Sequence, residues 1–163
     1  EGSKMIPTLI TPPVAMPVTL AEAKEQCRIV DAESDARIEQ MIGAAVAELD
    51  GYSGILGRCI MPQTWRVTAS AGEVVLPFPD VTGATFGGQP LTVTLSALGP
   101  VVTLTEGGDV TFTCAMPPHI LAMARSIVLL MVHAEYEVSL GSDVASFRDA
   151  IDRAVSRLRW WRV

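Results

Sequence analysis

The spacing of hydrophobic residues changes twice along this chain of 163 residues, and these changes constrain the fold more than any single motif. Up to about residue 57, apolar side chains recur every three or four positions, which is typical of amphipathic helices. From Gln63 the period becomes two, in short Val- and Thr-rich segments separated by glycine-containing turns, which is typical of antiparallel hairpins. After Pro117-Pro118 the helical spacing returns. The sequence therefore predicts an α+β fold, mainly α, with a small antiparallel β layer inserted into a four-helix core.

The first predicted helix has a clear start. Thr19-Leu20-Ala21-Glu22 has the form of a capping box, in which a threonine hydroxyl and a glutamate carboxylate satisfy the first free amides of a helix. Its inward stripe would contain Leu20, Ala23 and Cys27, with Val30 as a further candidate. The expected helices span residues 20–30, 35–54, 119–137 and 143–160, and the β region spans residues 63–115.

The residues ahead of this helix are predicted to be a leader, because Pro7, Pro12 and Pro13 break any helix there. We interpret residues 1–16 as this leader, with Glu1–Lys4 as an addition ahead of a natural start at Met5. Residues 17–163 are expected to form one domain, since domains commonly hold about 100 to 200 residues.

The later helices differ in character. Residues 119–137 are apolar on nearly every side, so the third helix is predicted to be buried all round. The last helix, which Ser142 could cap, has a single apolar stripe that includes Val144, Phe147 and Ile151. Hydrophobic residues make up 49% of the chain and charged residues only 18%, which suggests that some apolar surface packs against another copy or a partner.

The charge and the cysteines exclude several classes of protein. A net charge of −6 argues against a general nucleic-acid-binding surface, which needs clustered Lys and Arg. Cys27, Cys59 and Cys114 are odd in number and lack CxxC spacing, so we expect three packed thiols in a reducing compartment rather than disulfides or a zinc site. No apolar run reaches the roughly 18 residues of a membrane span.

No catalytic, cofactor-binding or metal-binding residues are predicted, and the chain is not expected to be an enzyme. His119 and His133 would lie about 21 Å apart along one helix, too far to share a metal. His133-Ala134-Glu135 has the H-x-E of zinc deaminases, but the P-C-x-x-C partner is missing. The glycines around residue 85 lie between strands, where a turn is a better explanation than phosphate binding.

The C-terminal end is the candidate partner-binding site. Five of the twelve basic residues fall in the last sixteen positions, on an otherwise acidic chain. Aromatic residues and arginine are enriched in interface hot spots, and this segment combines them in Arg157, Arg159, Trp160, Trp161 and Arg162. A solvated helix face, with one tryptophan folded onto the core, is the simpler alternative.

Four segments, taken in order, resemble the head-tail connector (adaptor) proteins of long-tailed bacteriophages and phage-like gene transfer agents. They are PVTLAEAKEQCRI, DARIEQMIGAAVAELDGYSG, LGRCIMPQTWRV and PPHILAMARSIVLLMVHAEYE. The resemblance covers about residues 12–137. The sequence departs from the family pattern at His133 to Tyr136, where H-x-x-Y replaces H-x-Y, and after Tyr136, where EVSLGSD replaces an N-R-E-A type continuation.

The resemblance implies a non-enzymatic virion protein that forms a ring, usually of twelve copies, under the portal. Such a ring extends the DNA channel without sequence-specific DNA binding and supports the stopper or tail. The protein would then be found in the virion neck, and in the host cytoplasm during assembly. We expect the C-terminal cluster to bind the portal, and deletion of residues 157–163 to abolish this binding in a folded subunit. The alternatives are a stopper or tail-completion protein of the same neck, or a ligand-binding module with the third helix lining a cavity.

Overall fold

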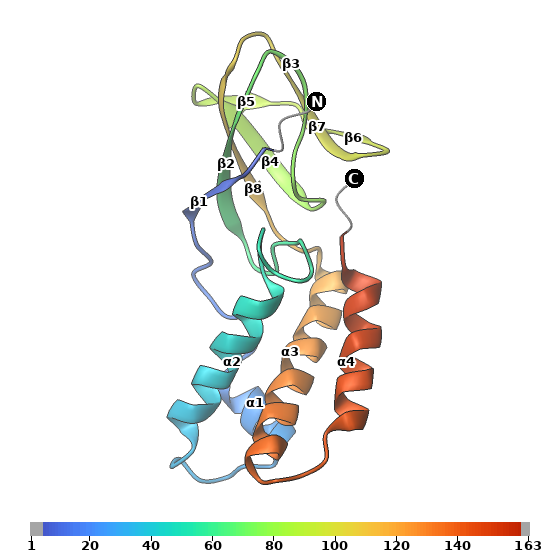
Figure 1. The fold of residues 1–163 in the computed structure, drawn as a ribbon. Helices are drawn as coiled ribbons and strands as arrows, with labels where there is room; N and C mark the ends of the chain where they lie inside the picture. The colour runs from blue at the N-terminus through green and yellow to red at the C-terminus, as the bar shows by residue number, and fades with distance from the viewer. Residues whose placement is uncertain (1–4, 161–163) are drawn as a thin grey trace.

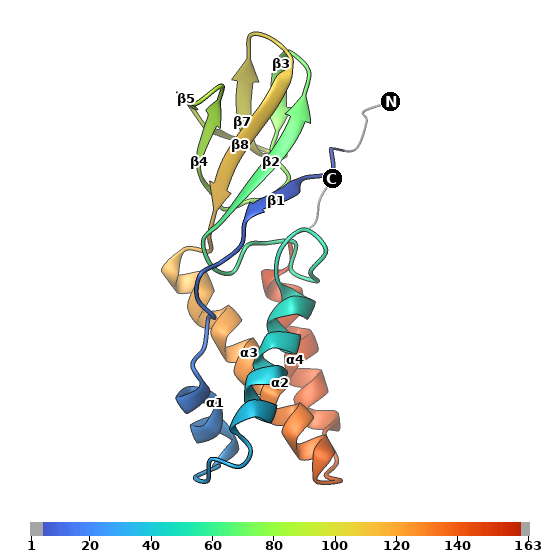
Figure 2. The same ribbon diagram turned by 90° about the vertical axis from the view of Figure 1, so that its left-hand side faces the viewer.

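The computed structural model describes residues 5–160 and divides them between the two ends of an elongated molecule (Figure 1). Within these residues, four helices form a bundle at one end, and eight strands in two antiparallel sheets form the other end. The same division is visible from the side in Figure 2. The predicted α+β class is confirmed. The prediction of a mainly α fold is not, because the strands build a two-sheet unit with its own core rather than a small layer.

The bundle consists of α1 (Leu20–Cys27), α2 (Asp35–Leu49), α3 (Pro118–Ser139) and α4 (Ala145–Leu158). α3 is the central helix, because it packs against each of the other three. Ala23 and Cys27 of the stripe predicted for α1 do face this core, as does the apolar face of α2 with Ile38, Ile42 and Leu49. Among the described residues, no helix is long and apolar enough to cross a membrane.

The capping box of α1 is present as predicted, but the helix ends earlier than residue 30. The Thr19 hydroxyl accepts a hydrogen bond from the Glu22 amide, and the Glu22 carboxylate accepts one from the Thr19 amide. Arg28 then takes the left-handed conformation, with φ of 58°, and ends the helix. Val30 is therefore 98% exposed, and its candidate place in the inward stripe is wrong.

α2 is also shorter than predicted, since it ends at Leu49 rather than near residue 54. Asp50 is already extended, and the chain turns back over the end of the helix. A Cβ atom at Gly54 would collide with the carbonyl oxygens of Leu49 and Asp50, so this turn requires glycine. Gly51, Gly54 and Gly57 thus belong to a separate loop that follows the helix.

α3 extends over nearly the predicted residues but is not buried all round. Its buried side chains are Ala124, Ile127, Val128, Val132 and Ala134. Met123 and Val138, by contrast, are exposed. Neighbouring helices cover only part of the circumference of α3, so its apolar composition predicted more burial than the bundle provides.

The larger sheet has the strand order β1-β2-β8-β4-β5, and the smaller sheet has the order β3-β7-β6. The strands are β1 (Thr8–Thr11), β2 (Gln63–Ala69), β3 (Gly72–Val75), β4 (Val81–Phe86), β5 (Gln89–Leu91), β6 (Thr94–Ser96), β7 (Gly99–Leu104) and β8 (Gly108–Cys114). A second hydrophobic core combines side chains of both sheets, such as Val67 and Phe112 from one sheet and Val102 from the other. Phe78, which is fully buried, packs its ring against those of Trp65 and Phe112.

β1 lies within the segment that was interpreted as a leader. It pairs antiparallel with β2, with Thr8 opposite Arg66 and Leu9 opposite Trp65. Prolines on both sides of β1 exclude a helix, as predicted, but they leave room for a short edge strand. The strand region therefore begins before the first helix and not only at residue 63.

The cysteines also differ from the prediction. Cys59 and Cys114 are joined as a disulfide, with Cα atoms 5.9 Å apart, and both are fully buried. The two cysteines are 55 positions apart in the sequence, and the segment between them contains most of the β unit. Its last strand, β8, ends at Cys114, next to the loop that contains Cys59. This removes the argument for a reducing compartment. Cys27 alone is a free thiol among the described residues, and it packs in the helical core as predicted.

Arg58 joins the bundle to the β unit. Its guanidinium binds both carboxylate oxygens of Asp80, with Nη1 to oxygen distances of 3.0 and 2.8 Å. Its Nε donates to the backbone carbonyl of Leu158, the last residue of α4, at 2.8 Å. Both charged side chains are mostly buried. Burial raises the pKa of the Asp80 carboxyl, and the neighbouring Arg58 opposes this shift.

A series of hydrogen bonds crosses the same junction between the bundle and the β unit. The Asp50 carboxylate accepts hydrogen bonds from the Ile60 amide at 2.7 Å and from the Gln63 side-chain amide at 2.6 Å. The Gln63 side-chain oxygen in turn accepts from the Trp65 indole at 3.1 Å. Gln63 is buried, so each polar group that it brings inside needs a partner. The PQTW segment thus ties β2 to the end of α2.

We expect Arg58→Ala to lower the free energy of unfolding by roughly 3 kcal/mol, because it leaves Asp80 buried without its partner. The double variant with Asp80→Ala should cost less than the sum of the two single changes. Denaturant unfolding of the four proteins measures this coupling. Arg66→Ala is the control: its ion pair with Asp109 is long, at 3.8 Å, and exposed, so it should contribute less than about 1 kcal/mol. Additive single changes at Arg58 and Asp80 would contradict the account.

The Asp50 carboxyl should give the junction a distinct pH dependence. Burial raises its pKa, although the hydrogen bonds from Ile60, Gln63 and Gly51 oppose the shift. A raised pKa means that the folded state binds the proton more tightly than the unfolded state, so this group's contribution to stability increases as pH falls.

We therefore expect the difference in free energy of unfolding between the wild-type protein and Asp50→Asn to increase in favour of the wild type as the pH falls from 7 to about 4, which is close to the ordinary pKa of an aspartate. Urea unfolding of both proteins across this range measures the difference, and groups common to both cancel. A constant or narrowing gap would show that the pKa of Asp50 is not raised in the folded state.

Candidate partner-binding surfaces

The C-terminal cluster is only partly described by the structure. Arg157 and Arg159 are exposed at the end of α4, and Trp160 is half-buried. Trp161 and Arg162 lie outside the described residues. The structure thus places two of the predicted arginines and one tryptophan at the point where the bundle meets the β unit.

Trp160 links three parts of the molecule. Its backbone amide donates to the carbonyl of Leu56 at 2.8 Å, which fixes the end of α4 against the loop after α2. Its indole ring lies against Gly99 at the start of β7, so closely that a Cβ atom there would be 3.4 Å from the ring. This packing agrees with the alternative in which one tryptophan folds back onto the protein, while the arginines stay exposed.

The same region changes the design of a truncation. Leu158 is only 4% exposed and belongs to the helical core, and its carbonyl accepts the hydrogen bond from Arg58. Deletion of residues 157–163 would remove this core residue. Such a truncation is therefore expected to destabilise the subunit as well as to remove the cluster, and single surface substitutions are the better test.

The two histidines have separate environments. His119 lies in the first turn of α3, whereas His133 lies in its C-terminal half. The His133 ring packs on Phe147 of α4 at 4.7 Å, lies 3.4 Å from the Gln26 side chain of α1, and is 3.5 Å from the Glu137 carboxylate. His133 thus joins α1, α3 and α4. Among residues 5–160, no three His, Cys, Asp or Glu side chains gather closely enough to hold a metal ion.

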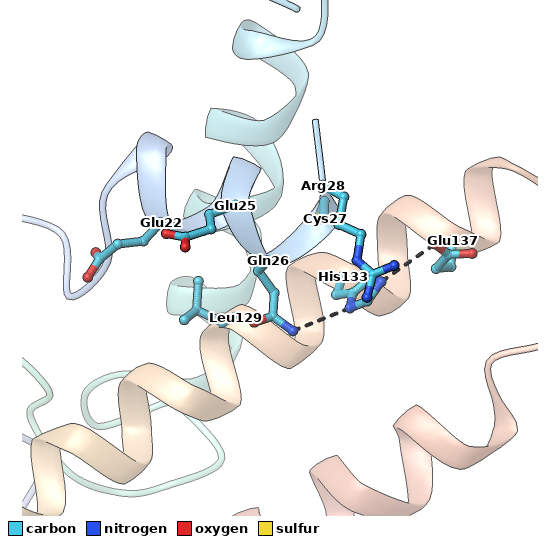
Figure 3. Close-up of a pocket in the computed structure, with 8 residues that line it drawn as sticks. All are labelled: Glu22, Glu25, Gln26, Cys27, Arg28, Leu129, His133 and Glu137. Atoms are coloured by element: carbon cyan, nitrogen blue, oxygen red, sulfur yellow. Dashed lines mark hydrogen bonds and ion pairs between the residues drawn. The ribbon is translucent and has the colours of Figure 1, made fainter. Parts of the chain in front are cut away.

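A cleft of about 700 Å³ lies between α1 and α3 (Figure 3). Its walls carry both signs of charge, since Glu22, Glu25 and Glu137 line it together with Arg28 and His133. Hydrogen bonds from Thr19 lower the pKa of Glu22, with a smaller effect from Arg125, to which Glu22 is also ion-paired. The cleft is a charged, open depression rather than the apolar cavity that a ligand-binding module would need.

Cys27 contributes to this cleft but is poorly suited to nucleophilic chemistry. Burial raises the pKa of its thiol, and the nearby Glu137 carboxylate raises it further. Nucleophilic cysteines need the opposite effect, a neighbouring positive charge that stabilises the thiolate. The geometry therefore favours the packing role that the sequence indicated.

A long groove follows α3 on the side that α1 does not cover. Three adjoining hollows of about 450, 270 and 290 Å³ lie along it, and all three are lined by Glu48 of α2 and Met131 of α3. In Figure 1 this part of α3 lies between α2 and α4. The sequence did not predict the groove, because its apolar composition indicated that α3 is buried on every side.

The tip of the β6–β7 hairpin is another surface that the sequence did not indicate. Leu95 is 83% exposed and Leu98 is 53% exposed. The two-residue spacing of apolar residues predicted a short antiparallel strand here. In the structure β6 has only three residues, all exposed, at the edge of the smaller sheet. Only the observed pairing could reveal that these leucines point away from the second core.

The comparison with known proteins gives a family-model match over part of the chain and a shared fold. The family model described as phage gp6-like head-tail connector protein matches residues 17–76. This segment contains α1, α2 and the junction loop, and it ends just after β3. No curated protein sequence matches the chain significantly.

Two solved structures share the fold over almost the whole chain. A chain from the neck of an empty gene transfer agent particle, computed with C6 symmetry, is 17% identical, with a TM-score of 0.68 over 98% of this chain and 97% of that one. A chain from the virion of a native gene transfer agent particle is 19% identical, with a TM-score of 0.66 over the same shares. The resemblance to phage head-tail connector proteins is therefore confirmed, by the family match at residues 17–76 and by a fold that extends the similarity across the chain.

Proposed function

We propose that this protein is a structural subunit of a phage-type neck: a head-tail connector that assembles as a ring under the portal, extends the DNA channel and supports the stopper or tail. The observation that carries the proposal is the fold shared with the neck chain of a gene transfer agent particle over 98% of the sequence. The family match over the α1–α2 region supports the same role.

Ring assembly agrees with the surface of the molecule. In a ring, one face of each subunit contacts a different face of its neighbour, and the contacts close when the rotation closes. Exposed apolar residues occur on separate parts of the protein, including Leu9 and Ile10 on β1 and Leu95 on β6. The neighbouring neck structure has sixfold symmetry, which is compatible with a twelve-membered ring because such a ring contains a sixfold axis.

The charge of the chain suits a channel for DNA. A net charge of −6 gives phosphate groups few adhesive contacts, so DNA could slide through the ring without sequence-specific binding. The protein would be made in the host cytoplasm and retained in the neck of the particle. A stopper or tail-completion protein is the alternative within the same neck, and the two-sheet β unit is the observation that favours this alternative.

The C-terminal cluster is the proposed portal-binding site. Arg157 and Arg159 are exposed beside a tryptophan that is anchored on the protein. This arrangement offers positive charge from a rigid support, which suits an acidic surface on the portal.

The ring can be tested by reconstitution with the cognate portal. We expect the purified protein to bind portal rings with one copy per portal subunit, because matched symmetry repeats each contact around the ring. Sedimentation and mass measurement of the mixture give the stoichiometry. Binding to the tail side of an already assembled connector ring, with none to the portal itself, would instead favour the stopper alternative.

Charge reversal tests the portal-binding site. We expect Arg157→Glu to weaken portal binding by at least about tenfold, because it places like charges together at a charged interface. Arg148→Glu is the matched control, since Arg148 is exposed on the same helix but lies more than two turns from its C-terminal end. Equal binding by both variants and the wild-type protein, measured by titration at low and high salt, would exclude Arg157 from the interface.

A further inference from the structure

The groove between α2, α3 and α4 has an apolar floor that is open to solvent. Met131 lines all three of its hollows. Ile55, at one hollow, is 38% exposed, and Val138, at another, is 44% exposed. Ile151 and Val155 of α4 continue the apolar lining. An exposed apolar surface that extends over several helices is typical of a contact site for another chain.

The walls of the groove carry charges of both signs. The ionisable residues that line the three hollows are Glu48, Glu135 and Asp152 and the arginines Arg37, Arg148 and Arg159. A charged segment placed in the groove would therefore meet like charge on one of the walls, which is unfavourable at an interface. The groove thus favours an apolar segment that has no ionisable side chain.

The loop between β1 and α1 contains such a segment, which we call the proline loop (residues 12–16). No ionisable side chain occurs anywhere in residues 5–21. Val14 is 98% exposed and Met16 is 55% exposed, so the subunit leaves both apolar side chains largely in water. The chain therefore carries both an open apolar groove and an uncharged apolar loop.

The proline loop is fixed at both ends. On one side β1 pairs with β2, with Thr11 opposite Thr64. On the other side Val18 is buried, and Thr19 forms the capping box that begins α1. Pro12 and Pro13 also restrict the backbone within the loop. A restrained loop loses little conformational entropy on binding, so this one is suited to present Val14 to a partner.

The proline loop and the groove lie on different sides of the bundle. The loop leads into α1, which packs against α2 and α3, whereas the groove lies on the side of α3 that α1 does not cover. In Figure 2 the loop descends to α1 on one side of the bundle, and α4 lies on the other side. Two different faces that contact each other in successive copies form a heterologous interface, which closes into a ring when the rotation closes.

We propose that the proline loop of one subunit occupies the α2–α3–α4 groove of the next copy, and that this contact, repeated around the ring, joins the subunits. The assignment rests on the proposed ring function. Val14 and Met16 pack on the apolar floor around Met131, while the charged walls form the edge of the contact. An apolar centre with a polar rim is the usual anatomy of a specific interface.

Cross-linking between two single-cysteine variants tests the contact. Val14→Cys and Ser156→Cys, made as proteins with tags of different size, are mixed, assembled on portal rings and oxidised. Ser156 is exposed on the α4 wall of the groove, and Ala44→Cys probes the α2 wall in the same way. We expect the mixed dimer with at least one of these walls to exceed the control by at least about fivefold, because a disulfide requires Cα atoms within about 7 Å.

Ser126→Cys, mixed with Val14→Cys, is the matched control. Ser126 and Ser156 are both exposed helix serines whose hydroxyls donate to a carbonyl of their own helix, but Ser126 does not line the groove. The natural cysteines interfere little, since Cys27 is buried and Cys59 and Cys114 are joined to each other.

A charge in the proline loop provides a second test. We expect Val14→Asp to raise the protein concentration needed for ring assembly on the portal by at least about tenfold, because it places a carboxylate on an apolar floor. The thermal unfolding temperature should stay within about two degrees of the wild type, since the side chain is exposed. Val30→Asp is the matched control, because Val30 is also a valine that is 98% exposed.

The outcomes separate the loop contact from the proposed function. If the wild-type protein forms no ring, with or without the portal, the proposed function fails and the loop contact fails with it. If rings form but Val14→Cys joins neither wall of the groove more often than it joins Ser126→Cys, only the loop contact is wrong. Cross-links from Val14→Cys to the portal instead of to a second copy would assign the loop to the portal and likewise overturn the contact between copies.

Discussion

The contact of Arg58 with Asp80 and with the end of α4 is the interaction on which the arrangement of the whole molecule depends. One guanidinium holds a loop of the β unit through Asp80 and the last carbonyl of α4 through Leu158. The Cys59–Cys114 disulfide lies beside it, at the point where the chain leaves the bundle and returns to it. The hydrogen bonds from Gln63 to Asp50 and from Trp65 to Gln63 also hold the β unit against the end of α2. These contacts make two units with separate cores behave as one elongated body.

The junction also gives a physical meaning to motifs that resemble those of head-tail connectors. The D-G-Y-S-G segment turns the chain back over the end of α2, where Gly54 alone fits against the helix carbonyls. The P-Q-T-W segment places Gln63 between Asp50 and Trp65. Both motifs therefore maintain the angle between the bundle and the sheets. In a ring, a fixed angle within each subunit is required if all copies are to contact their neighbours in the same way.

The sequence predicted features that depend on local chemistry and missed those that depend on distant contacts. The Thr19–Glu22 box and, apart from Val30, the stripe of α1 follow from residues within a few turns of one another, and the sequence predicted them correctly. Val30 is exposed because α1 ends at Arg28, and no glycine or asparagine marks this helix end in the sequence. β1, the disulfide and the packing of Trp160 on Gly99 all join segments more than 50 residues apart, so spacing alone could not reveal them.

The candidate surfaces follow the same division. Composition correctly marked the end of α4 as basic and aromatic, but it gave no reason to connect that end with a hairpin near residue 97. Likewise, the apolar composition of α3 suggested full burial, whereas the structure leaves a groove beside Met131 that the packing of α2 and α4 does not fill. Contacts within one chain therefore bury both hydrophobic cores, and they leave several apolar surfaces exposed for contacts with other chains in an assembly.

The most direct test of the central claim is an electron-microscopy map of the neck in purified particles that contain this protein. The account predicts a ring of density next to the portal, in which each subunit has a helical bundle and a two-sheet unit related as in Figure 1. A map in which this fold is absent from the ring adjoining the portal, or occupies only the stopper or tail, would contradict it.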